Sequence, residues 1–113
     1  MSWSFQKSSQ VGPSNWQNRY SNCESDTQSP INIMTQITKK CNMLCKLKMR
    51  YKPSKCNIVM KNNIPFILYD KGSFVNYKDN KYSLYQIAIH TPSLHLIDNQ
   101  RYCIELNLYQ ISN

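Results

Sequence analysis

Hydrophobic and polar residues alternate with a period of two along much of the chain after residue 44. The clearest alternation covers residues 46–52, where three apolar side chains alternate with four basic ones: Leu47, Met49 and Tyr51 against Lys46, Lys48, Arg50 and Lys52. Successive side chains of a strand point to opposite faces, so this pattern predicts a half-buried strand with a basic outer face. Pro53 and Ser54 end it.

Further stretches rich in strand-forming residues follow, separated by turn residues. We expect strands at residues 56–60, 66–69, 73–77, 82–90 and 101–111, and a short one at 31–33. The intervening turns are predicted at residues 62–63, 70–72, 78–81 and 91–93. No segment shows a sustained period of 3.6 residues, so the pattern predicts a β-rich unit without amphipathic helices.

The first part of the chain has a different character. Residues 1–29 contain Gly12, Pro13 and several Ser and Asn, which indicates an irregular arm. Its aromatic residues are expected to pack together as a cluster: Trp3, Phe5 and Trp16. The predicted organisation is one domain over residues 1–113, with the arm at 1–29 and the sheet at 30–113.

Composition adds a charge argument. The 113 residues are 41% hydrophobic and 12% aromatic, which is typical of one small globular domain. Fourteen Lys and Arg against six Asp and Glu give a net charge of +8. This excess favours an anionic partner, namely nucleic acid, a sulfated polysaccharide, acidic lipid or an acidic protein surface. Composition equally allows solvated lysines that have no partner.

Targeting segments and cysteine chemistry change this picture little. The polar first seven residues lack the apolar run of a signal peptide, and no stretch approaches the ~20 apolar residues of a membrane span. The five cysteines are odd in number, so reduced thiols are expected. The spacing of Cys41 and Cys45 is not that of a zinc or redox motif.

Two separated motifs resemble a known family. Gly-Pro-x-x-Trp at residues 12–16 is followed by Gln-Ser-Pro-Ile-Asn-Ile at 28–33, and His-Thr-Pro-Ser-Leu-His at 90–95 is followed by Glu-Leu-Asn-Leu at 105–108. Both, in this order, resemble the N-terminal half of α-type carbonic anhydrases. The resemblance implies a partial sheet of mostly antiparallel strands, and hence a truncated domain of mainly β class.

The resemblance also implies which positions would bind zinc. In the family, two histidines on one strand, written Gln-x-His-x-His, and a third on the neighbouring strand hold the metal. Ala88 stands at the first of these positions, His90 at the second and Asn107 at the third. Zinc would be expected in the family, but one imidazole of three remains, so we predict that zinc is absent and that no cofactor is bound.

Other family positions point the same way. Leu94 replaces the glutamate that orients the threonine gating the zinc hydroxide. Gln86 matches a residue that orients the first ligand, and it remains here without that ligand. His95 and Glu105 match a polar pair behind the metal site, which we expect to serve the fold.

These observations favour a catalytically inactive module with a structural or binding role, as part of a larger assembly. Its exposed sheet edge would be covered by another protein chain or by self-association. A second hypothesis is an adhesion module that binds a polyanion such as a sulfated glycan through its basic residues: Lys39, Lys40, Lys46, Lys48, Arg50 and Lys52. A third is an active zinc enzyme that hydrates carbon dioxide. Nucleic-acid binding is not favoured, because only charge supports it.

Overall fold

The computed structural model describes residues 4–42 and 45–112. Contacts within the chain divide it into two compact units, Met1–Ile31 and Asn32–Asn113, which are described separately. In the part of the chain that the structure describes, no helix is long and apolar enough to cross a membrane.

The N-terminal unit contains two short 3-10 helices, η1 (Pro13–Asn15) and η2 (Ser21–Glu24). Phe5 and Trp16 meet edge to face with ring centroids 5.7 Å apart, and the Trp16 indole N–H donates to the Val11 carbonyl at 3.0 Å. Trp3, the third aromatic of the predicted cluster, lies outside the described residues. Gly12 is buried where a Cβ would overlap the Gln6 carbonyl oxygen, so a larger residue would have to displace backbone.

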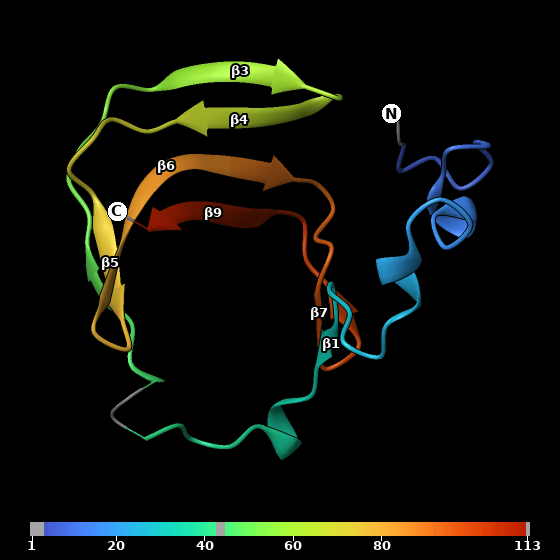
Figure 1. The fold of residues 1–113 in the computed structure, drawn as a ribbon, viewed down its shortest axis with the longest axis horizontal. Coiled ribbons are helices and arrows are strands. Elements are labelled where there is room, and N and C mark those ends of the chain that lie inside the picture. The colour runs from blue at the N-terminus through green and yellow to red at the C-terminus, as the bar shows by residue number, and fades with distance from the viewer. Residues whose placement is uncertain (1–3, 43–44, 113) are drawn as a thin grey trace. The chain divides into compact units, whose positions relative to one another are not determined.

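The second unit is built on a six-stranded antiparallel sheet (Figure 1). Its strands are β2 (Lys48–Arg50), β3 (Asn57–Lys61), β4 (Ile64–Leu68), β5 (Phe74–Tyr77), β6 (Asn80–His90) and β9 (Glu105–Ser112). The order is β2-β5-β6-β4-β3, and β9 also pairs with β6. One edge of β6 is shared by two strands, since β5 pairs with residues 80–83 and β4 with residues 86–88. β9 pairs with residues 82–90, which overlap both stretches, so it lies along the opposite edge of β6. The predicted mainly β, mostly antiparallel class is confirmed.

A second, smaller sheet joins distant parts of this unit. β1 (Asn32–Ile33) runs parallel to β7 (Leu96–Ile97), which pairs antiparallel with β8 (Gln100–Arg101). The η3 turn (Thr35–Ile37) follows β1 and is held by Asp98, whose carboxylate accepts hydrogen bonds from the Thr35 N–H at 2.8 Å and hydroxyl at 2.7 Å. This tie fixes the chain that leads from the small sheet towards β2.

One predicted strand proves to be two. The sequence predicts a single strand over residues 101–111, but β8 ends at Arg101 and β9 begins at Glu105. Tyr102 exchanges hydrogen bonds with Ser93: its N–H donates to the hydroxyl oxygen at 2.9 Å, and its carbonyl accepts the Ser93 N–H at 2.8 Å. These bonds hold the chain against the loop after β6, so the strand is interrupted there.

The hairpin turns follow the expected chemistry. Asn62 and Asn63 have φ of 50° and 62° and join β3 to β4, as the Asn-Asn pair predicts. Lys78 and Asp79 have φ of 47° and 63° and join β5 to β6, so the loop predicted at 78–81 is a tighter turn. Such two-residue turns match the right-handed twist of the flanking strands.

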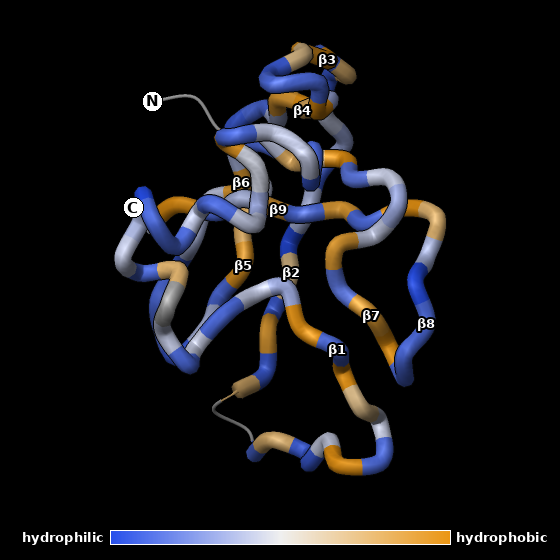
Figure 2. Tube along the Cα trace, turned by 90° about the vertical axis from the view of Figure 1, so that its right-hand side faces the viewer, coloured by the Kyte–Doolittle hydropathy of each residue, from blue (hydrophilic) through white to orange (hydrophobic). Residues whose placement is uncertain are grey.

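Little of the sheet is buried. The buried hydrophobic side chains among the described residues are Val75, Leu84 and Ala88, although the strands carry many hydrophobic positions (Figure 2). The expectation of a half-buried strand at residues 46–52 is wrong: β2 has three residues, and Leu47 and Met49 are 58% and 61% exposed. Both side chains are therefore largely open to solvent, although Val75, the cross-strand neighbour of Met49, is buried.

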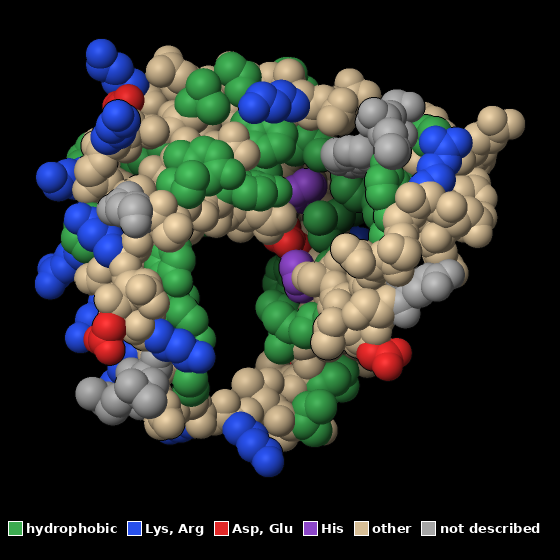
Figure 3. All heavy atoms as spheres, in the orientation of Figure 1, with side chains coloured by type: hydrophobic (Ala, Val, Ile, Leu, Met, Phe, Trp, Pro, Cys, Tyr) green, Lys and Arg blue, Asp and Glu red, His purple; other side chains and the backbone are tan. Residues whose placement is uncertain are grey.

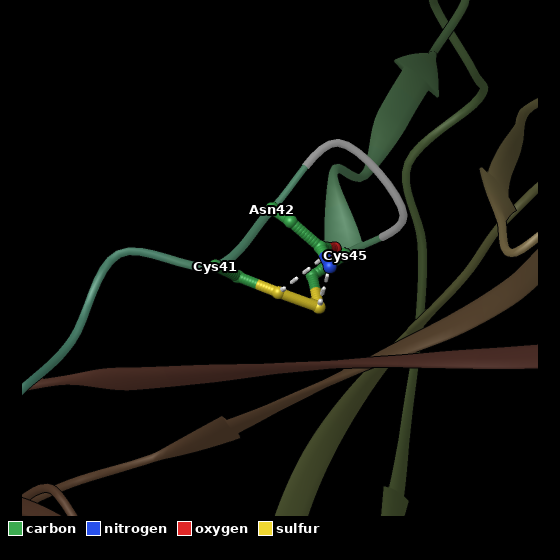
Figure 4. Close-up of a disulfide and its surroundings, with 3 residues drawn as sticks. All are labelled: Cys41, Asn42 and Cys45. Atoms are coloured by element: carbon green, nitrogen blue, oxygen red, sulfur yellow. Dashed lines mark hydrogen bonds between the residues drawn. A yellow bond between two sulfur atoms is a disulfide. The ribbon is translucent and has the colours of Figure 1, made fainter.

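The expectation of reduced thiols is wrong for one pair of cysteines. Cys41 and Cys45 form a disulfide, with their Cα atoms 5.7 Å apart as that bond requires. The Asn42 side-chain oxygen lies 3.9 Å from each sulfur (Figure 4). Among the described residues, the other thiols are free: Cys23, Cys56 and Cys103.

Candidate active site

Strands β6 and β9 bring the three candidate metal positions together. Ala88 lies directly opposite Asn107, and His90 lies opposite Glu105. Because side chains alternate along a strand, Ala88, His90 and Asn107 share one face of the sheet. Ala88 is completely buried, and the other two are half-buried.

A β-bulge lies in β6 just before these positions. Leu84 pairs with Gln110 and Gln86 with Tyr109, so β6 carries one extra residue, Tyr85, at this point. Leu84 and Gln86 therefore lie on opposite faces although they are two residues apart, while Gln86 shares the face of Ala88 and His90 by simple alternation. A one-residue change of register would turn all of these side chains to the other face. Nothing in the period-two pattern of β6 signals the bulge.

His95 and Glu105 are brought into direct contact. The His95 Nδ1 lies 2.7 Å from the Glu105 Oε1, and the other carboxylate oxygen accepts the backbone N–H groups of Leu94 at 2.9 Å and His95 at 2.8 Å. Burial acts to raise the pKa of Glu105, but the hydrogen bonds and charge of His95, together with the N–H of Leu94, hold this pKa below its ordinary value. The carboxylate therefore ties the segment after β6 to the start of β9.

Leu94 takes part in the contact with Glu105 through its backbone N–H. Its apolar side chain has no group that could orient a hydroxyl, which is the role of the family glutamate at this position. Nearby, the Ser93 hydroxyl donates to the His95 carbonyl at 2.8 Å, and the Arg101 guanidinium donates to the Ser93 carbonyl at 2.6 Å. These bonds make the loop at residues 91–95 a well-connected support for β9.

The donor atoms at the candidate metal positions do not fit a zinc site. Ala88 has no atom that can bind a metal, and Asn107 offers an amide oxygen where zinc prefers nitrogen or sulfur. Within residues 4–42 and 45–112, no three His, Cys, Asp or Glu side chains gather closely enough to hold a metal ion. Of the three cross-strand positions, His90 alone carries an imidazole.

Comparison with known proteins identifies the fold family. The model of the eukaryotic-type carbonic anhydrases matches residues 11–113. The chain belongs to this family.

The chain is similar to curated carbonic anhydrases and to solved structures over nearly all of its length. It is 29% identical to alpha carbonic anhydrase 2 of Arabidopsis thaliana, an alignment that covers 94% of this chain and 46% of that protein. A hyperthermostable carbonic anhydrase from a hydrothermal vent chimney has a TM-score of 0.80 at 24% identity, covering 96% of this chain and 49% of that one. Dioscorin complexed with ascorbate has a TM-score of 0.85 at 22% identity, covering 99% and 49%. The two structural matches show the fold alone, and the chain spans about half the length of these relatives.

The six basic residues proposed from the sequence as an anion-binding face lie in different elements of the fold. Lys48 and Arg50 lie in β2 on one face, with Lys46 and Lys52 just outside its ends. Lys39 and Lys40 lie between η3 and β2, outside any strand. The sheet brings a further residue, Lys81 of β6, to the same face as Lys48, since both pair with Asn76 of β5. Sequence reasoning missed Lys81, because its proximity depends on the order of the strands.

Proposed function

We propose that this carbonic anhydrase family member is a non-catalytic module. The observation that carries the proposal is that Ala88 and Asn107 face each other across β6 and β9 beside His90. Catalytic zinc in proteins has three protein ligands and a water whose pKa it lowers to about 7, for which carbonic anhydrase is the standard example. A single imidazole does not hold the metal in this way, so no zinc-bound hydroxide forms at neutral pH.

We further propose a structural or binding role in a larger assembly, in which another protein chain or a second copy covers the open edge of the sheet. β9 pairs with β6 along one edge, and within the described residues nothing pairs with its other edge. Both of its faces expose apolar side chains, since Leu106 is 54% exposed on one face and Ile111 57% on the other. A strand that is apolar on both faces is typical of the interior of a sheet.

The first test restores the lost ligands. We expect the double variant Ala88→His/Asn107→His to bind one zinc ion per chain, because it rebuilds three imidazoles around one point. The single variants Ala88→His and Asn107→His are matched controls and should bind zinc much more weakly. Metal content after dialysis and the absorption spectrum of the cobalt-substituted protein measure the binding.

The second test uses the natural chain, so it remains decisive if a histidine at the buried Ala88 position disturbs folding. We expect no stoichiometric zinc and no carbon dioxide hydration above the background rate in stopped-flow assays. Stoichiometric zinc together with hydration by the natural chain would support the third hypothesis, an active enzyme, and would overturn the proposal.

A further inference from the structure

Two rows of cross-strand neighbours run over β2, β5 and β6. In one row, Asn76 lies between Lys48 and Lys81; in the next, Phe74 lies between Arg50 and Ser83. Directly paired residues share a face, so Lys48, Arg50 and Lys81 all project from the same side of the sheet. Lys and Arg side chains gather over this side of the second unit in Figure 3. We call Lys48, Arg50, Asn76 and Lys81 the basic patch.

Phe74 positions one positive charge of the basic patch and lies beside another. The Lys81 Nζ lies over the Phe74 ring, 4.1 Å from its centroid, which is the geometry of a cation–π contact. Arg50 lies directly opposite Phe74 on the other side. Phe74 therefore has one cation over its ring and a second cationic residue as its cross-strand neighbour, and an anion bound near both would relieve their mutual repulsion.

No acidic group among the described side chains forms an ion pair with these charges. Among the described side chains, the ion pair that forms is His95–Glu105, and none involves a lysine or arginine. Three of the six carboxylates accept hydrogen bonds from their own surroundings instead: Asp70 from Lys55 N–H, Asp98 from Thr35 and Glu105 from His95. All three cations of the patch are exposed and available to an external ligand.

We propose that the basic patch binds a sulfated polysaccharide. Alternate residues of a strand are about 6.6–6.8 Å apart, and residues two strands apart about 9.4–9.8 Å, so the three cations form an array that one sulfate cannot span. A chain with repeated sulfate groups can contact all three. The Arg50 guanidinium can bind a sulfate with two parallel hydrogen bonds, and the Asn76 amide adds a neutral donor between the lysines.

The composition of the patch favours a sulfated glycan over single-stranded nucleic acid. Nucleic-acid sites of that kind combine positive charge with open aromatic rings on which bases stack. The aromatic ring in the patch, Phe74, is half-buried and already covered by Lys81. The patch thus offers charge and hydrogen-bond donors without a stacking surface.

The test compares two triple variants of the full chain that change the net charge equally. The patch variant is Lys48→Gln/Arg50→Gln/Lys81→Gln, and the control is Lys7→Gln/Lys55→Gln/Lys61→Gln. Lys61 is a close match for Lys81, because it also lies over a phenylalanine, with its Nζ 5.6 Å from the centroid of Phe66. The probe is a size-fractionated heparin decasaccharide, and the readout is Kd from titration calorimetry, with circular dichroism to check each fold.

We expect the patch variant to weaken binding at least tenfold and the control variant less than threefold. Equal weakening by both variants would mean that net charge alone attracts the probe and would overturn the proposal. The natural chain should also bind the decasaccharide more tightly than two other anionic probes, a 20-nucleotide oligo-dT and vesicles with 30% anionic lipid. Binding to either probe that is as tight as binding to the decasaccharide would overturn the proposal as well.

Discussion

The carboxylate of Glu105 connects the start of β9 to the loop that follows β6. It is 14% exposed, and it accepts two backbone N–H groups in addition to its contact with the His95 ring. A carboxylate in these surroundings is favoured in its charged form, which is why its pKa is lowered despite burial. The pair thus holds the loop after β6 against the start of β9.

At the residue scale, we predict that Glu105→Gln destabilises the protein by about 1–3 kcal/mol at pH 7, the usual cost of weakening buried charged hydrogen bonds. The pKa of Glu105 is lower in the folded than in the unfolded protein. The contribution of this carboxylate to stability is therefore fully present above pH 4.5, its ordinary pKa, and is lost as the pH falls through the lower pKa of the folded protein. Urea unfolding between pH 3 and pH 7 measures both effects.

The exposed carboxylate of Asp26 provides the control, since Asp26→Asn should leave the stability at pH 7 within about 0.5 kcal/mol of the natural chain. If Glu105→Gln proved as mild as this control, or left the acid dependence of stability unchanged, the pair would not have the supporting role argued here.

At the element scale, the β3–β4 hairpin depends on two residues in the left-handed region. Asn tolerates this region better than most residues, but glycine is preferred at the second position of such turns. We therefore predict that Asn63→Gly stabilises the chain by about 0.5 kcal/mol, because glycine has no Cβ. Asn63→Ala should destabilise it by about 1 kcal/mol, because alanine lacks the short polar side chain that lets Asn adopt positive φ. Thermal unfolding followed by circular dichroism distinguishes these shifts.

The same substitution in an extended part of the hairpin is the control. Asn57 begins β3, where glycine adds freedom to the unfolded chain without relieving strain, so Asn57→Gly should destabilise by about 0.5–1 kcal/mol. Identical signs for Asn57→Gly and Asn63→Gly would contradict the turn geometry.

At the scale of the whole molecule, the strands expose many apolar side chains, and the proposal of a partner at β9 can be tested on the isolated chain. We predict that the natural chain binds hydrophobic dyes and sediments above the mass of one chain, because the edge and faces of β9 are uncovered. Leu106→Lys should shift the sedimentation towards a single chain while costing less than about 0.5 kcal/mol in stability, as for other exposed positions.

Ile37→Lys is the matched control, since Ile37 is 78% exposed in η3, outside the large sheet. It should leave the association of the chain unchanged. A natural chain that is monomeric, unfolds cooperatively and binds no dye would be inconsistent with a partner at β9.

The sequence by itself determined much of this protein. Period-two alternation located most strands, Asn62 and Asn63 identified a turn, and the motifs at residues 12–33 and 90–108 indicated the family. The same motifs led to the prediction that Ala88 and Asn107 stand where the family has histidines. These features are local, because they depend on residues close together in the chain.

The tertiary structure decided the rest. It placed Ala88 opposite Asn107, brought His95 against Glu105 and introduced the bulge at Tyr85. It also joined Lys81 to Lys48 through Asn76 and left the Leu47 and Met49 side chains exposed, against the expectation of a half-buried strand. Such neighbours depend on strand order and register, which arise from long-range pairing, and burial depends on which layers cover the sheet. Neither is encoded in the period of a single strand.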